Sequence, residues 1–135
     1  MTATVLTNQG YSIRRETDFS FEDAVARVRV ALQAQGFGVL TEIDVAATMA
    51  AKLDLKMAPF LILGVCNPAL AHRALAAEPE VGVLLPCNVV VRSEGEKTVV
   101  EAMDPEAALG LVKNDAVRVV AIEAKQRLSK ALESL

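Results

Sequence analysis

Hydrophobic positions along the chain change period several times, which indicates strands that alternate with helices. Tyr11 and Ile13 alternate with polar neighbours, as on one face of a half-buried strand. Apolar residues then recur every three or four positions from Phe21, with Ser20 as the predicted N-cap and Gly36 as the stop. The pattern therefore predicts a strand followed by an amphipathic helix.

A second strand and a second helix follow in the same way. Phe37, Val39 and Ile43 fall on one face of a period-two segment that ends at Asp44. Aspartate is a good N-cap, so Asp44 is predicted to start a short alanine-rich helix that runs to about Leu53.

The next segment predicts a buried strand and a helix. Residues 59–65 are apolar on both faces, which is typical of a central strand covered on both sides. Asn67 and Pro68 favour a helix start, because Asn caps well and Pro at the first helical position loses no hydrogen bond. This helix is expected to end near residues 78–79.

The following apolar segment, residues 81–92, is long for one strand and contains Pro86 in its middle. Proline cannot donate to a sheet, so we expect an edge strand or a bulge at that point. Residues 93–96 are predicted to turn, and residues 97–103 to pair back as a hairpin.

Two helices are expected to complete the chain. Asp104 and Pro105 resemble a capped helix start, and a longer helix is predicted from about Asp115. The apolar stripe of that last helix comprises Val117, Ala121, Ala124, Leu128, Ala131 and Leu135.

The element order β-α-β-α-β-α-β-β-α-α predicts an α+β two-layer sandwich. Its mixed or antiparallel sheet would have about five strands, with helices packed on one face. Residues 1–8 read as a loose lead-in, and no linker divides the chain, so residues 1–135 are predicted to form a single domain.

Composition excludes several classes of protein. Among 135 residues, 53% are hydrophobic, which is enough for a sizeable core, so we do not expect disorder. The 14 basic and 17 acidic residues give a net charge of −3. We therefore expect neither nucleic acid nor a membrane as a partner. The N-terminal segment lacks the pattern of an export signal, so a cytoplasmic location is expected.

Two short motifs nearly mirror each other: Cys66-Asn67-Pro68 and Pro86-Cys87-Asn88. A thiol just before a helix start can be stabilised as a thiolate, but Cys66 could equally be a small buried hydrophobic residue at a strand end, and Cys87, on an apolar strand face, could be an inert core thiol. If the two segments meet, Cys66 and Cys87 could line one pocket as thiols, as a redox couple or as soft-metal ligands. Asn67 and Asn88 would supply polar contacts there.

Paired carboxylates form the other candidate site. Glu42 and Asp44 point to the same side of a strand and could bind a ligand or cation. Alternatively, Asp44 only caps its helix and Glu42 pairs with Lys52 or Lys56. The single histidine, His72, is expected to be solvated, and a catalytic pair with Cys66 is the more demanding alternative.

Five blocks in one register, over about residues 12–112, resemble a bacterial and archaeal family labelled domain of unknown function 302. The resemblance implies a small α+β protein that is often dimeric in crystals, with no established activity, substrate or cofactor. One branch of that family shares both cysteine motifs, whereas another shares only the Asn-Pro turn. The blocks are Glu42-Ile43-Asp44, Leu63 to Pro68, Ala71 to Leu75, Leu84 to Val91 and Asp104-Pro105.

These observations lead to three functional hypotheses. The first is a non-enzymatic module, expected to be a homodimer, that binds a small molecule or a soft metal ion around Cys66 and Cys87. The second is a thiol-dependent redox or nucleophilic enzyme, in which Cys87 or His72 assists Cys66. The third is a purely structural homo-oligomeric interaction domain that uses an apolar sheet face and the stripe of the last helix.

Overall fold

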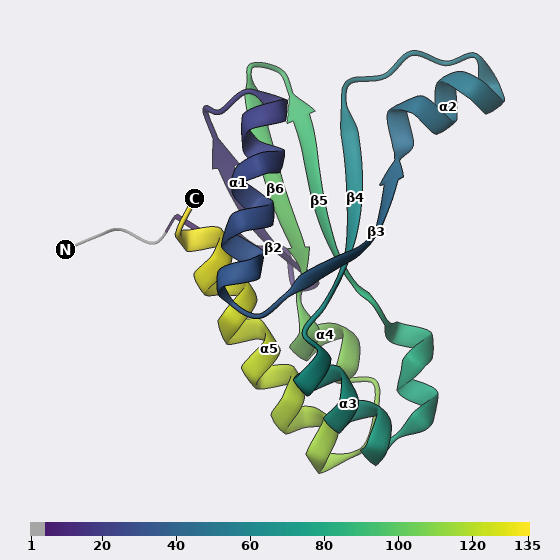
Figure 1. Ribbon diagram of the computed structural model, residues 1–135, viewed down its shortest axis with the longest axis vertical. Helices are drawn as coiled ribbons and strands as arrows, with labels where there is room; N and C mark the ends of the chain where they lie inside the picture. The colour runs from purple at the N-terminus through teal and green to yellow at the C-terminus, as the bar shows by residue number, and fades with distance from the viewer. Residues whose placement is uncertain (1–4) are drawn as a thin grey trace.

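The computed structural model describes residues 5–135 and shows one six-stranded antiparallel sheet (Figure 1). The strands are β1 (Thr7–Asn8), β2 (Ser12–Thr17), β3 (Gly38–Asp44), β4 (Phe60–Cys66), β5 (Cys87–Glu94) and β6 (Lys97–Met103). Their order across the sheet is β1-β2-β6-β5-β4-β3. The predicted α+β class is confirmed. The sheet has one strand more than expected, because β1 forms within the segment predicted to be a lead-in.

The predicted helices are all present, and the predicted caps Ser20, Asp44, Asn67 and Asp104 are confirmed, whereas the cap of the last helix, Asn114, was not predicted. Ser20 accepts a hydrogen bond from the Asp23 amide, and Asn67 accepts one from the Leu70 amide. No helix in residues 5–135 combines the length and apolarity needed to cross a membrane. The helices are α1 (Phe21–Ala34), α2 (Val45–Leu53), α3 (Pro68–Ala77), the 3-10 helix η1 (Pro79–Leu84), α4 (Pro105–Leu109) and α5 (Asp115–Glu133).

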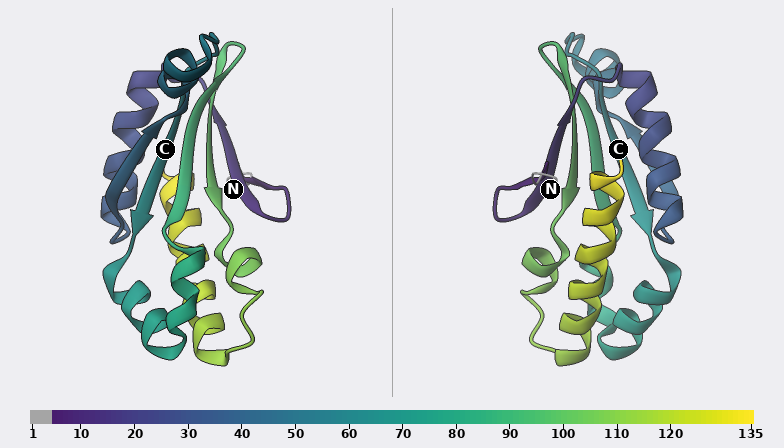
Figure 2. Two further views of the ribbon diagram at one scale, coloured as in Figure 1. Left: turned by 90° about the vertical axis from the view of Figure 1, so that its right-hand side faces the viewer. Right: turned by 90° about the vertical axis from the view of Figure 1, so that its left-hand side faces the viewer.

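Two helices cover one face of the sheet, as predicted. Helices α1 and α5 pack on the apolar side chains of β4, β5 and β6, and Figure 2 shows α1 along one side of the sheet. The short helices α3 and α4 lie beyond the end of the sheet and pack on the N-terminal half of α5. The stripe of α5 is buried from Val117 to Ala131 inside this chain, so it is not the free interaction surface that the third hypothesis required.

A bulge in β3 changes which side chains face the core. The register with β4 shifts between Val39 and Thr41, so Leu40 is an extra residue. Phe37 is buried, whereas Ile43 is 51% exposed. The prediction that Ile43 shares a face with Phe37 was therefore wrong, because one inserted residue moves every later side chain to the other face.

The prediction that β4 is covered on both faces was wrong. Leu63 and Val65 are fully buried against the helices, but Phe60 and Ile62 on the opposite face remain half-buried. Nor does β2 begin at Tyr11, which is 71% exposed and precedes the strand.

The long apolar segment, residues 81–92, is two elements rather than one strand. Residues 79–84 form η1, and β5 begins only at Cys87, after Pro86. Pro86 therefore lies just outside the sheet and neither marks an edge nor creates a bulge. Strand β5 itself is central, between β4 and β6.

Candidate functional site

A cavity of about 310 Å³ lies where the sheet meets α3 and α5. Its walls come from two separate clusters of buried side chains, one under the sheet and one around α3, α4 and α5. The cavity lies between these two clusters. It is lined by Phe37, Leu40, Val65, Cys66, Asn67, Leu70, Ala71, Ala74, Leu75, Leu85, Pro86, Cys87, Leu109, Val120 and Ala124.

Three small side chains in the lining leave space in the cavity. Ala71 and Ala74 on α3 and Ala124 on α5 all line the cavity, and larger side chains at these positions would fill part of it. The deep wall includes Leu109 and Val120, which are both buried. The sequence did not single out these alanines as site residues, because alanine on a helix is also the ordinary choice for close helix packing.

The outer rim of the cavity is apolar and exposed. Leu40 is 65% exposed and Leu75 is 38% exposed, and Pro86 completes the rim. Because these side chains face solvent, the cavity has an open mouth rather than being sealed in the core.

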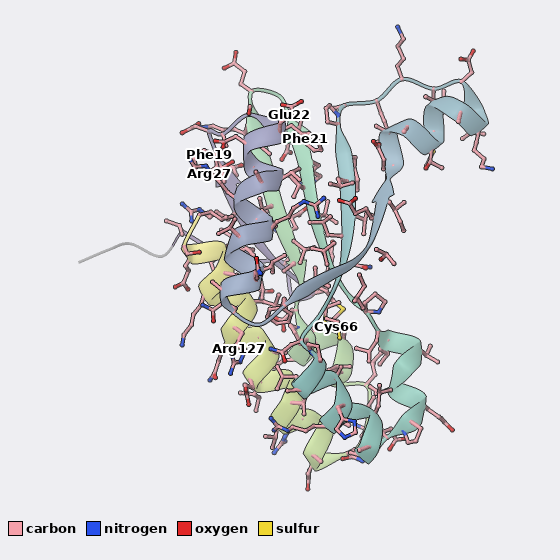
Figure 3. The ribbon with its side chains drawn as sticks, in the orientation of Figure 1. Phe19, Phe21, Glu22, Arg27, Cys66 and Arg127 are labelled. Carbon is pink, nitrogen blue, oxygen red and sulfur yellow. The ribbon has the colours of Figure 1, made fainter. Side chains whose placement is uncertain are left out.

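The two cysteine motifs do meet at this cavity. Cys66 is the last residue of β4 and Cys87 is the first residue of β5, where it pairs with Val65. Figure 3 shows Cys66 at the junction between the sheet and the lower helices. Both cysteines are free thiols, with Cys66 half-buried and Cys87 buried. The structure therefore meets the condition under which the two cysteines could line one pocket.

The two thiols differ in their electrostatic environment. Burial, with a smaller electrostatic contribution from Cys66, raises the pKa of Cys87 to about 11. Cys87 is consequently a neutral thiol at physiological pH.

Asn67 also lines the cavity, but its amide holds two helices in place. Its Nδ2 donates to the carbonyl of Gln35 (3.4 Å) and its Oδ1 accepts from the Leu70 amide (3.3 Å). Gly36 has a φ of +84°, and a Cβ atom there would lie 2.9 Å from Asn67 Nδ2. The Asn-Pro turn thus fastens the end of α1 to the start of α3.

The structure does not bring Asn88, Glu42 or Asp44 to the cavity. Asn88 is exposed and pairs with Gly64 on the opposite face of the sheet, because it is one residue out of phase with Cys87. Asp44 caps α2 by accepting from the Ala47 amide (2.8 Å). Glu42 had been expected to pair with Lys52 or Lys56, but it pairs with Arg29 of α1 instead.

His72 lies on the exposed surface of α3 and does not line the cavity. Within residues 5–135, no group of three or more His, Cys, Asp or Glu side chains is placed to hold a metal ion. The two thiols are thus the soft-metal candidates that the cavity contains.

Asp104 does more than the helix capping expected of it. It is buried, caps α4, accepts from Asn8 Nδ2 (2.9 Å) and pairs with Lys125 of α5 (3.0 Å). Burial opposes its ionisation, but hydrogen bonds from Asn8, Lys125 and the Glu106 amide outweigh that effect and lower the pKa of Asp104. The sequence gives the cap, but nothing in it indicates the distant partners Asn8 and Lys125.

The chain is similar to a solved structure and matches a known protein family. No curated protein matches it. Among solved structures, the crystal structure of an uncharacterized conserved protein DUF302 from Bacillus stearothermophilus superposes with a TM-score of 0.85 at 29% identity. The match covers 91% of this chain and 96% of that one. The family model described as Domain of unknown function DUF302 matches residues 13–135, so the region of likeness extends through α5. The chain belongs to the DUF302 family.

Proposed function

We propose that the protein is a small-ligand-binding module that takes up an uncharged apolar molecule beside Cys66 and Cys87. The observation that supports this proposal is the open cavity of about 310 Å³, whose lining is apolar except for the two thiols and Asn67. Apolar cavities of about 150 Å³ already take up benzene. The cavity here has about twice that volume, which suits an aromatic ligand between naphthalene and a three-ring compound in size.

The lining favours an uncharged ligand. It contains no acidic or basic side chain, and Cys87 is held neutral by its raised pKa of about 11. A charged ligand would lose its hydration without gaining a partner, which is a large free-energy penalty in an apolar site. Thiol sulfur atoms are polarisable and make favourable contacts with aromatic rings, so the two cysteines would form a soft wall for such a ligand.

Thiol-dependent catalysis and soft-metal binding have less support from the geometry. A thiol-dependent enzyme needs a base beside Cys66, but Cys87 is protonated at neutral pH and His72 is exposed outside the cavity. Soft-metal binding would depend on Cys66 and Cys87 alone, without a third His, Cys, Asp or Glu ligand from residues 5–135.

Binding of a neutral fluorophore tests the proposal. N-phenylnaphthylamine is uncharged and becomes brighter when it leaves water, so its fluorescence in a titration reports occupation of an apolar site. Wild-type protein is expected to bind it saturably. Ala71→Phe, which places a ring in the cavity, is expected to weaken binding at least tenfold.

Ala69→Phe is the matched control, because Ala69 lies on the same helix but is exposed and outside the cavity lining. It should bind the fluorophore as the wild type does. Bound fluorophore should also slow alkylation of Cys66 by N-ethylmaleimide. Equal binding by the wild type and Ala71→Phe, or no saturable binding by the wild type, would contradict the proposal.

A further inference from the structure

One long edge of the sheet is free. Strand β3 pairs with β4 on one side, and no strand within residues 5–135 pairs with its other side. The opposite edge is the two-residue strand β1, which offers little to pair with. An unpaired edge presents backbone donors and acceptors that readily accept another strand.

A helix with little cover from the rest of the structure adjoins this edge. We call residues 45–57 the α2 arm; it comprises α2 and the segment that returns to β4. Helix α2 has nine residues and none of them is buried. Leu53 is 61% exposed, Leu55 54% and Met57 42%. Helices this short are marginal in water unless an apolar face packs against something. Strands β3 and β4 contact α2 only in part, so the exposed apolar side chains of the arm are left for another surface.

The cavity mouth lies at the other end of the same edge. Figure 1 shows α2 projecting from the upper end of β3, whereas α3 lies below its lower end. The rim residues Leu40, Leu75 and Pro86 are apolar and exposed. One strand edge therefore carries an apolar projection at one end and an apolar opening at the other.

We propose that two copies of this chain pair antiparallel through β3, so that the α2 arm of each copy covers the cavity mouth of the other. Antiparallel pairing about a two-fold axis reverses the direction of the strand, which brings the Asp44 end of one copy to the Gly38 end of the other. Pairing of residues 42–44 with residues 44–42, beyond the bulge, centres the two-fold axis on Ile43 and sets the start of the second copy's arm opposite Leu40.

Charges at the two ends are complementary. Lys52 and Lys56 on the arm make no ion pair with any residue in the range 5–135, and neither does exposed Glu80. Glu80 belongs to η1, which packs against the rim residue Leu75. The arm of one copy would place its lysines near this carboxylate of the other.

A second copy satisfies both surfaces with one symmetry operation. Any other partner would need one feature that fits the arm and a different feature that fits the mouth. The inference rests on the proposed function in one respect: the cavity that the arm covers is the proposed ligand site. That site would then be complete only in the dimer.

The oligomeric state of matched variants tests the inference. Light scattering of the wild type at micromolar concentration should give twice the chain mass of 14.4 kDa. Leu53→Glu combined with Leu55→Glu should give the monomer mass. Leu111→Glu combined with Val119→Glu adds the same charges at similarly exposed positions outside the edge, and should remain dimeric. Circular dichroism checks that every variant is folded.

Hydrogen exchange on the wild type gives a second measurement that needs no variant. When the protein is diluted below the dissociation constant of the dimer, the amides of residues 38–57 and of the rim should exchange faster. The arm variant should also bind N-phenylnaphthylamine several-fold more weakly, because its cavity mouth is uncovered.

The outcomes separate this inference from the proposed function. A wild-type monomer, an arm variant that stays dimeric, or a control that dissociates would overturn the interface, even if the fluorophore binds. A dimer with the expected variant pattern that binds no fluorophore would support the interface and overturn the proposed ligand site.

Discussion

Cys66 ends β4 and Cys87 begins the neighbouring strand β5, and both side chains line one cavity. Cys87 pairs in register with Val65, so the two cysteines are diagonal neighbours at the end of the sheet. This relationship places two thiols of different character, one half-buried and one buried, on the wall of an otherwise apolar space.

The two thiols should differ in reactivity. Because burial raises the pKa of Cys87 to about 11, only a small fraction of it is thiolate near pH 8. In Cys66→Ser, which leaves Cys87 as the remaining thiol, alkylation by iodoacetamide should be about 100-fold slower than that of a peptide thiol, since each pH unit is a factor of about ten.

The rate for Cys66→Ser should continue to rise well above pH 9, as the Cys87 thiolate forms. Cys87→Ser provides the comparison, because it retains only half-buried Cys66. Similar rates and similar pH profiles in the two variants would contradict the assigned environments.

Asp104 should make stability depend on acid. Its pKa is lowered in the folded state, so it stabilises the fold above the ordinary carboxyl pKa, and that contribution is lost as the pH falls through the folded value. Asp104→Asn should lower the free energy of unfolding by about 2 kcal/mol at pH 7, because a buried charged hydrogen bond to Lys125 is removed.

Urea denaturation at several pH values measures this effect. The difference between the wild type and Asp104→Asn should shrink as the pH falls toward 3. Glu106→Gln is the control, because Glu106 is exposed and lies 3.9 Å from the same lysine. It should change stability little. A difference for Asp104→Asn that is constant with pH would rule out the charge as its source.

Gly64 should be intolerant of a side chain. A Cβ atom there would lie 2.3 Å from Thr41 Oγ1 and 3.0 Å from Pro86 Cγ, so neighbouring residues must move. Gly64→Ala is expected to destabilise the fold by about 1–3 kcal/mol, the usual penalty for overpacking.

Thr41→Ala removes the closer of the two contacts and should recover part of that loss in the double variant. The thermal midpoints of the four proteins in this cycle measure the coupling between the sites. Strictly additive effects would show that the contact between residues 41 and 64 is not responsible.

Local signals carried most of the fold prediction. The N-caps Ser20, Asp44 and Asn67 and the helical spacing from Phe21 are properties of adjacent residues, so they could be recognised in the sequence alone. The bulge at Leu40 could not, because its polar and apolar pattern is compatible with a regular strand. The apolar segment around Pro86 was likewise ambiguous between a strand and a 3-10 helix.

The site was predictable only in part, for the same physical reason. The mirrored motifs identified Cys66, Asn67 and Cys87 before their proximity was known. Asn88 was wrongly grouped with them, because its face depends on the phase of β5 at its first residue. The cavity itself arises from how α3 and α5 meet the sheet, and such tertiary packing leaves no local pattern.

An uncharged apolar molecule is proposed to enter the cavity that Cys66 and Cys87 help to line. Titration of isotope-labelled protein with naphthalene, followed by amide and methyl NMR shifts, tests it most directly. Saturable shifts confined to lining residues, including Val65, Leu70 and Val120, are expected. Shifts that are absent, or that occur only at surfaces away from this cavity, would contradict it.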